Sequence, residues 1–369
     1  MKNRFDKIIT AVISLIIVCF CVGMIVTPEK EFSAAENRTL TSKPKLTAKS
    51  LTSGKYTADL GKYLADQFPL RDGFVSAKAY FELLQGKGEN NDVIYAKEGV
   101  LIPKAEADSS LMEENLRSIK VFSESIDTDV LVAALPRTID VFEEFLPKGY
   151  PKEQNKKVWE EYNTLTKSLD LKTLDLYETL CESNAYYSTD HHYTSHGAYL
   201  TYRQLQKELN YTPKEKDFFK IEKVADDFCG TSMRTSGFYL AKKDSIELYR
   251  YEKDCDYTVV ADDKQISLYD MGKLDTTDKY GVFLGGNHSR VDIKTKGENK
   301  PKLLIVRDSF ADSLVPFLAI HYDITLVDLR YFRSSVAELV NSEGYDKVLV
   351  LLNISEMATS KNLPYLQLS

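Results

Sequence analysis

The sequence predicts an α/β protein with a three-layer arrangement, in which helices cover both faces of a mainly parallel sheet. Short, nearly continuous apolar runs lead to this prediction, because strands buried on both faces do not alternate apolar and polar residues. These runs are residues 130–135, 303–306, 324–327 and 348–352. Segments with helical periodicity fall where crossover connections of a parallel sheet are expected. They are residues 111–122, 156–169, 196–209 and 334–340.

An uncharged run at residues 8–26 is long enough to cross a hydrocarbon core of roughly 30 Å as a helix. Three basic residues and only one acidic residue precede it, so the positive-inside rule places residues 1–7 in the cytoplasm and the rest outside. We therefore expect a single-pass protein of the cell membrane. A cleaved signal peptide is the alternative, because small residues follow at 33–35.

The remaining chain divides into an extended stem at residues 27–47 and a catalytic domain at residues 48–369. Prolines and weak periodicity indicate the stem, in which the cluster Glu36-Asn37-Arg38 is either a docking element or simply solvated. A helix is predicted from about residue 51 to residue 68, where Pro69 ends it. Residues 93–102 predict a hairpin added to the sheet or lying over its edge.

Composition excludes some classes of protein. The chain has 369 residues, a formal net charge of -7 and no long basic run, so nucleic acid is not an expected partner. Its 23 tyrosines suit sugar clefts and ordinary packing alike. Outside the apolar run only Cys181, Cys229 and Cys255 remain, which allows at most one disulfide and leaves a Cys229–Cys255 bridge open.

Residues 190–197 (DHHYTSHG) hold three of the five histidines and are the first candidate for chemistry. In an extended segment Asp190 and His192 would share one face, so the carboxylate could orient the imidazole as a general base. His196, one helical turn beyond His192, and His191 are alternative bases. An imidazole of this kind is what a serine needs to become a nucleophile.

Ser309 is the candidate nucleophile, because it follows the strand ending at residue 306 and precedes a helical run at residues 311–320. Ligands of open parallel sheets gather at such strand ends, and the helix dipole there can stabilise an oxyanion. The alternative is that Asp308 and Ser309 only cap the helix. Arg307 could hold a substrate carboxylate or pair with Asp308.

Residues 283–288 (FLGGNH) are a second candidate for oxyanion binding. Gly286 could offer its amide and Asn287 its side-chain NH2 to the developing charge, although Gly-Gly-Asn is also typical of a plain turn. In the histidine segment, Asp190, His191, His192 and His196 are also potential metal ligands. Tyr193 stands where a zincin would need glutamate, and the further aspartates of manganese phosphoesterases are not found, so no metal and no cofactor is expected.

Asp190-His191-His192-Tyr193 resembles the motif of the DHHW family of bacterial envelope proteins, with tyrosine in place of tryptophan. Other segments share the resemblance, which spans nearly the whole chain after the apolar run. They are residues 36–38, 66–72, 285–288, 307–309 and 328–332. The family is similar to the SGNH-hydrolase-like, flavodoxin-like domain of alginate O-acetyltransferases. That similarity implies a triad of Asp190, His192 and Ser309, with Asn287 assisting at the oxyanion.

The resemblance further implies an O-acyltransferase or esterase that moves an acetyl group to or from a cell-envelope or secreted glycan through an acyl-serine. Transfer and hydrolysis share their first step, so the sequence does not separate them. Acetyl-CoA is cytoplasmic, so a multi-spanning membrane O-acyltransferase is the expected acyl-donor partner. The alternative is a non-catalytic glycan-binding or envelope assembly protein on the same fold.

Overall fold

The computed structural model describes residues 2–33, 38–104, 109–181, 185–254, 256–297 and 299–368. The chain forms two compact units, one of residues 1–91 with 234–239 and one of residues 92–233 with 240–369. Residues 48–91, which the sequence analysis groups with the catalytic domain, thus pack with the N-terminal unit.

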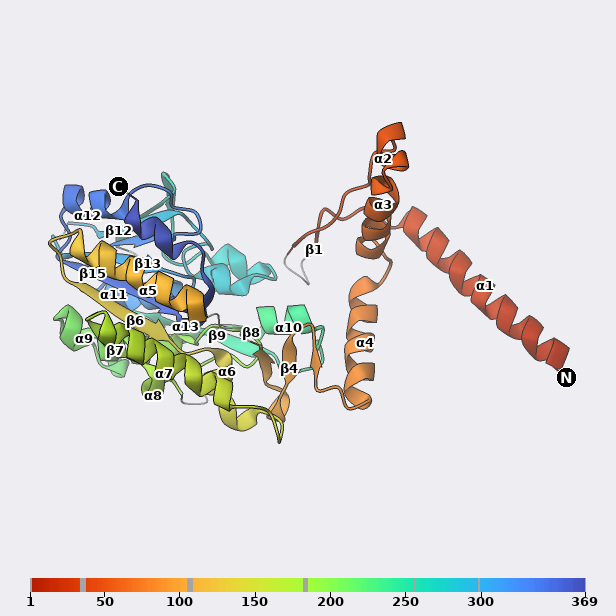
Figure 1. Cartoon of the computed structure of the whole chain (residues 1–369), viewed down its shortest axis with the longest axis horizontal. Helices are drawn as coiled ribbons and strands as arrows, with labels where there is room; N and C mark the ends of the chain where they lie inside the picture. Colours follow the sequence, from red (N-terminus) through yellow and green to blue (C-terminus); the bar gives the residue numbers. More distant parts are fainter. Residues whose placement is uncertain are drawn as a thin grey trace. The chain divides into compact units, whose positions relative to one another are not determined.

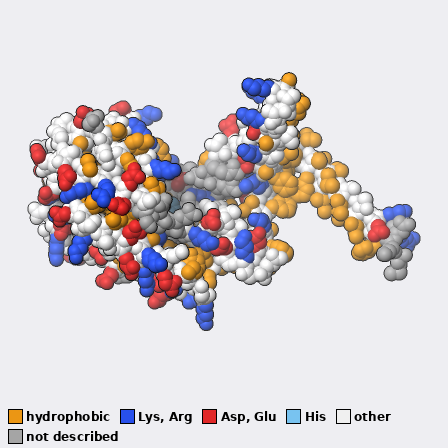
Figure 2. Space-filling model, viewed as in Figure 1, with side chains coloured by type: hydrophobic (Ala, Val, Ile, Leu, Met, Phe, Trp, Pro, Cys, Tyr) orange, Lys and Arg blue, Asp and Glu red, His pale blue; other side chains and the backbone are white. Residues whose placement is uncertain are grey.

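The N-terminal unit begins with an apolar helix, α1. Within its residues 4–26, an 18-residue window reaches a mean hydropathy of 2.9, and apolar side chains cover much of its exposed surface (orange in Figure 2). Instead of one helix over residues 51–68 there are two, because Gly54 adopts a left-handed φ of 73° between them. The helices and strands of this unit are α1 (Lys2–Val26), β1 (Phe32–Ser33), β2 (Arg38–Thr39), α2 (Ala48–Thr52), α3 (Lys55–Asp66), α4 (Arg71–Leu84) and β3 (Glu89–Asn90).

The segment expected to be an extended stem is tied to the helices that follow it. The backbone of Lys30 exchanges two hydrogen bonds with the side-chain amide of Gln67, at 2.9 and 2.8 Å. The Thr41 amide donates to Asp66 Oδ2 at 2.8 Å. Residues 36 and 37 of the expected Glu36-Asn37-Arg38 element lie outside the described residues, as does Cys255 of the possible disulfide.

The second unit contains a mixed sheet of eight strands in the order β11-β10-β12-β14-β13-β15-β6-β7. Neighbouring strands run parallel from β14 through β13, β15 and β6 to β7. On the other side of β14, each of β12, β10 and β11 runs antiparallel to the strand before it in the sheet. The mainly parallel sheet is therefore confirmed. The strands are β6 (Val130–Leu135), β7 (Thr173–Asp175), β10 (Tyr257–Ala261), β11 (Lys264–Ile266), β12 (Arg290–Thr295), β13 (Lys302–Arg307), β14 (Asp323–Val327) and β15 (Lys347–Asn353).

Buried clusters cover both faces of this sheet, as a three-layer fold requires. Because successive side chains of a strand point to opposite faces, Leu303 and Ile305 of β13 join one cluster and Leu304 and Val306 the other. Helices α5 and α7, which pack against each other (Figure 1), belong to the second cluster. The helices of this unit are α5 (Ser109–Glu124), α6 (Thr138–Val141), α7 (Glu153–Ser168), α8 (Tyr177–Leu180), α9 (Ser195–Leu209), α11 (Ala311–Leu318), α12 (Val336–Glu343) and α13 (Ile354–Thr359). Helix α10 (Thr231–Ser236) begins in this unit, and its residues 234–236 belong to the N-terminal unit.

Two further hairpins lie outside the eight-stranded sheet. Strands β4 (Val93–Tyr95) and β5 (Leu101–Pro103) form the predicted hairpin, which does not join the sheet. Instead, the Leu101 amide donates to the Ser188 carbonyl at 2.8 Å, so this hairpin supports the histidine segment. Strands β8 (Lys220–Phe228) and β9 (Asp244–Arg250) form the other.

We predict that Phe122→Ala destabilises the second unit by about 3–5 kcal/mol, because the side chain is 0% exposed within the α5 side of the core. The matched control is Val121→Ala on the next residue of α5, which is 47% exposed and should change the free energy of unfolding by no more than about 0.5 kcal/mol. Fluorescence of Trp159, the single tryptophan and part of the same cluster, would follow denaturant unfolding. Equal effects of the two substitutions would contradict this packing.

Candidate active site

The histidine segment forms a tight loop before α9. The Thr194 amide donates to the Ala185 carbonyl at 2.8 Å, and the Tyr187 amide donates to the His192 carbonyl at 3.2 Å. Asp244, the first residue of β9, anchors the loop by accepting hydrogen bonds from the backbone amides of Ser188 and Thr189. The loop therefore holds a defined conformation from both its own backbone and a neighbouring strand.

Asp190 and His192 are paired by an Asx-type turn rather than by the extended segment that the sequence predicted. Asp190 Oδ1 accepts a hydrogen bond from the His192 amide at 3.0 Å and lies 2.6 Å from His192 Nδ1. Burial opposes the charge of Asp190, but His191, His192 and Thr231 stabilise it and hold its pKa well below its usual range. An ionised carboxylate only accepts, so Nδ1 of His192 carries the proton and Nε2 is an acceptor.

Ser309 lies within hydrogen-bond distance of His192 Nε2. It lies between the end of β13 and the start of α11, and its Oγ is 2.7 Å from His192 Nε2. The structure thus brings together the three residues predicted as a triad, Asp190, His192 and Ser309, although the sequence separates His192 from Ser309 by 117 positions. Asp190 and His192 are buried, whereas Ser309 is partly exposed and lines a cavity of about 440 Å³.

Thr231, at the start of α10, extends the relay and was not predicted from the sequence. Its amide and its hydroxyl both donate to Asp190 Oδ2, each at 2.6 Å. Because the Thr231 hydroxyl donates its single proton to Asp190, its oxygen can only accept from His191 Nδ1, which lies 2.7 Å away. Gly230 permits this approach, because a Cβ there would lie 2.3 Å from the Cβ of Asp190.

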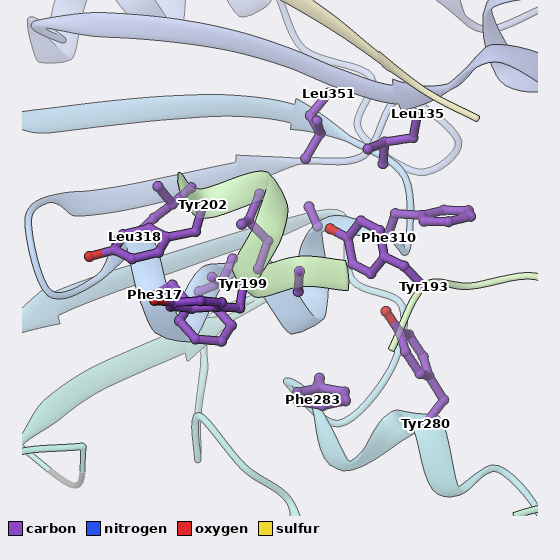
Figure 3. Packing of buried hydrophobic residues seen from close by; sticks show 14 of the residues in the cluster. Leu135, Tyr193, Tyr199, Tyr202, Tyr280, Phe283, Phe310, Phe317, Leu318 and Leu351 are labelled. Carbon is purple, nitrogen blue, oxygen red and sulfur yellow. The ribbon is translucent and has the colours of Figure 1, made fainter. Parts of the chain in front are cut away.

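Aromatic rings fix the plane of the His192 imidazole. Tyr280 stacks on it with ring centroids 3.9 Å apart and an interplanar angle of 10°, and Phe310 packs from another side at 4.9 Å. The Tyr280 hydroxyl also donates to the Ser309 carbonyl at 3.1 Å. Tyr193, in the place of the tryptophan of the DHHW motif, packs edge-on to Phe310 at 5.2 Å (Figure 3).

The sequence predicted that Arg307 either holds a substrate carboxylate or pairs with Asp308. In the structure it is not among the residues that line the cavity, and its ion pairs are with other carboxylates. Its guanidinium is buried, with Nη1 lying 3.1 Å from Asp312 Oδ1 and 3.8 Å from Asp328 Oδ2. Asp312 lies on α11 and Asp328 follows β14, so the sequence next to Arg307 does not reveal these two partners. Burial raises the pKa of Asp312 to about 7, despite the nearby Arg307. Arg307 is thus a structural ion-pair residue beneath Ser309.

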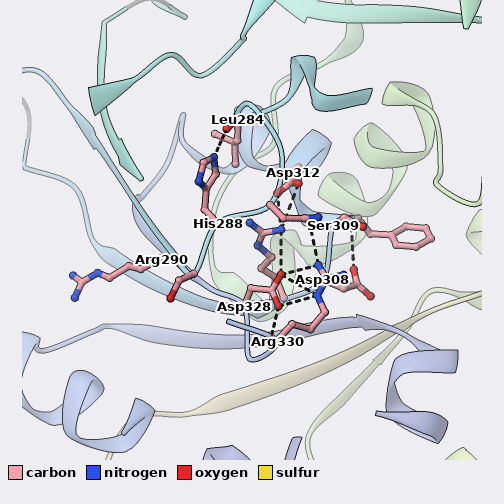
Figure 4. A network of polar contacts seen from close by, with 12 residues as sticks. Leu284, His288, Arg290, Asp308, Ser309, Asp312, Asp328 and Arg330 are labelled. Atoms are coloured by element: carbon pink, nitrogen blue, oxygen red, sulfur yellow. Dashed lines mark hydrogen bonds and ion pairs between the residues drawn. The ribbon is translucent and has the colours of Figure 1, made fainter. Parts of the chain in front are cut away.

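Arg330 and Arg137 both line the cavity, and neither was singled out from the sequence. Asp328 holds Nε and Nη2 of Arg330 at 3.0 and 2.7 Å (Figure 4). Asp308 is also buried, and its two oxygens accept from the amides of Phe310 and Asn353, at 3.0 and 2.6 Å. Asp308 thus forms an Asx turn before α11 rather than the helix cap considered as the alternative, since the N-cap of α11 is Phe310 and no side chain caps this helix.

Gly286 and Asn287 are not among the described residues that line the cavity. Asn287 Oδ1 accepts a hydrogen bond from Arg330 Nη2 at 3.3 Å. Leu284, Gly285 and Gly286 all have left-handed φ values, which matches the plain turn that the sequence analysis held as an alternative.

Asp190, His191 and His192 present donor atoms within 4.8 Å of one another, close enough for a shared cation. Both oxygens of Asp190 are already engaged, by His192 and Thr231. A cation would have to displace the proton between Asp190 and His192, so this geometry fits a proton relay better than a metal centre.

Comparisons with known proteins agree on family and fold. The sequence model of the family described as DHHW protein matches residues 151–327. A DHHW family protein from Eubacterium siraeum superposes with a TM-score of 0.65 at 21% identity, covering 76% of this chain and 97% of the other. Bacillus cereus PatB1, solved with a sulfonyl adduct, gives 0.63 at 17% identity, covering 76% and 100%.

The O-acetyltransferase domain of Pseudomonas putida AlgJ gives a TM-score of 0.48 at 14% identity, covering 73% of this chain and 92% of that domain. The comparison with curated proteins found no match. The match to the family model spans the loop with Asp190 and His192 as well as Ser309. Over residues 151–327 the chain is therefore similar to the DHHW family.

Proposed function

We propose that this protein is an extracytoplasmic O-acyltransferase or esterase that works through an acyl-Ser309 intermediate. The observation that carries the proposal is the continuous hydrogen-bonded relay from Asp190 through His192 to Ser309, which ends at a cavity. Such a relay supplies the two things a serine hydroxyl lacks as a nucleophile, a base and a group that orients the base.

In the first half-reaction, His192 Nε2 takes the proton of Ser309 as Oγ attacks the acyl carbonyl. Asp190 stabilises the imidazolium that forms, and the positive end of the α11 dipole faces the developing oxyanion. The tetrahedral intermediate collapses when the leaving alkoxide takes the proton from His192. In the second half-reaction, His192 deprotonates an acceptor hydroxyl or water, which attacks the acyl-serine. Ser309 Oγ then leaves and takes the proton back from His192, which restores both residues.

The acceptor that we propose is a hydroxyl of a cell-envelope or secreted glycan, and the transferred group is acetyl. Both follow from the family resemblance and from the expected topology, with residues 1–7 in the cytoplasm and α1 as a single-pass anchor. The acyl group must then cross the membrane, which requires a multi-spanning membrane O-acyltransferase as partner. Thr138, Ser355 and Thr359 add hydroxyl groups to the cavity wall, in keeping with a polyhydroxylated acceptor.

We predict that a sulfonyl fluoride forms a covalent adduct on Ser309 and abolishes turnover of an acetyl ester by the full chain. Ser309→Ala should remove the adduct, and His192→Ala should lower kcat by about 10²–10⁴-fold because the general base is lost. Ser355→Ala is the matched control, since Ser355 lines the same cavity without contacting His192. Intact-protein mass and ester turnover measure both effects. An unmodified Ser309 in active protein would refute the nucleophile, and no turnover at all would favour the non-catalytic binder.

We also predict that Thr231→Ala lowers kcat by roughly 10–100-fold and leaves KM nearly unchanged. The substitution removes a hydrogen bond to the charged Asp190, of a kind worth about 1.5–3 kcal/mol, without touching the cavity. Thr231→Ser keeps the hydroxyl and should retain most of the activity. If the alanine and serine variants lose kcat equally, Thr231 acts only through packing and not through the relay.

A further inference from the structure

Helix α4 carries apolar side chains on two opposite faces. One face packs inside the N-terminal unit: Ala79 is fully buried, and Tyr80 meets Phe238 with ring centroids 5.5 Å apart. The other face is an exposed apolar stripe with spacings of four, three, four and three residues. It consists of Leu70 (81% exposed), Phe74 (48%), Ala77, Phe81 (61%) and Leu84 (87%).

A stripe of this kind is costly in water. A surface helix normally turns charged and polar residues to solvent, and contiguous exposed apolar patches often mark contacts with a protein or a membrane. Lys78 and Glu82, which pair at 3.6 Å, lie at the side of the stripe and do not cover it. Something other than water must therefore contact this face.

The start of the stripe is joined to α1. Phe20 of α1 stacks on Phe68 with centroids 4.6 Å apart and contacts Phe74 at 5.7 Å. A Cβ on Gly23 would lie 3.0 Å from Pro69 Cγ, so the two segments approach closely. Phe20, Gly23 and Met24 are the partly covered positions of α1, and they lie on one face of the helix.

The contact between α1 and the start of the stripe indicates how deep the stripe would lie relative to a membrane spanned by α1. Phe20 lies six residues before the end of α1 at Val26, which is about 9 Å along a helix axis. If α1 spans a bilayer, Phe68 and Phe74 pack against it at the boundary of the acyl chains. We propose that the apolar stripe of α4 lies on the outer leaflet, in contact with lipid, as an interfacial helix does. This inference rests on the anchor role proposed above for α1, but not on the acyl-transfer chemistry.

A second copy of the chain fits the stripe less well. Its spacing resembles a coiled-coil seam, but α1 already contacts the stripe at Phe74. From Leu70 to Leu84 the stripe spans only about two heptads, fewer than the three or four heptads of a stable coiled coil. A lipid surface requires no such register and accepts leucine and phenylalanine together.

The test uses the full chain in vesicles of equal parts phosphatidylcholine and phosphatidylglycerol, with and without acyl-chain bromine as a quencher. Trp159→Phe removes the native tryptophan, and Phe81→Trp then places a reporter on the stripe. Its fluorescence should fall at least about twofold with brominated lipid. Glu82→Trp, one residue on and turned to another face, is the matched control and should change little.

Equal and weak quenching at both positions, with α1 still present by intact mass, would overturn the lipid contact. If a Phe81→Cys variant forms a disulfide crosslink to a second copy of the chain, the stripe is an interface between two copies rather than a lipid contact. Loss of α1 from the mature chain would overturn the anchor and the stripe together. None of these readouts uses ester turnover, so a failed acyl-transfer proposal would be seen separately by the Ser309 experiments.

Discussion

The whole candidate site depends on one contact between distant parts of the chain, the hydrogen bond between His192 and Ser309 at 2.7 Å. A serine hydroxyl and an imidazole form such a bond only if both are held to within a few tenths of an ångström. The fold meets this demand from two directions. Parallel pairing of β13 with β14 and β15 fixes the strand before Ser309, and Asp244 with the β5 backbone fixes the loop before His192.

Much of this arrangement could be predicted from the sequence. The central strands β6, β13, β14 and β15 are buried on both faces and read as continuous apolar runs, so they were found nearly to the residue. Ser309 was found because it directly follows one of those runs. The antiparallel strands were missed, since β10 and β12 alternate buried and partly exposed residues and β11 is largely exposed. Such short alternating segments are weak signals beside strong helical neighbours.

The misses within the site have a common physical cause. Thr231 reaches Asp190 across 41 positions, and Arg307 finds its partners on α11 and after β14 rather than in the adjacent Asp308. Periodicity and spacing describe a residue's own element, whereas these contacts are created by packing between elements. For the Thr231–Asp190 contact, the neighbouring Gly230 is a sequence signal, because a side chain there would collide with Asp190. This glycine can be interpreted only after its neighbour in the fold is known.

The stacking of Tyr280 on His192 has a consequence for the energetics of proton transfer. The aromatic face carries partial negative charge, so it attracts the imidazole more strongly after that ring becomes a cation. The same tyrosine is bonded through its hydroxyl to the backbone of Ser309, which keeps this favourable surface in place as the nucleophile reacts. A single buried side chain thereby couples the basicity of one residue to the position of the other.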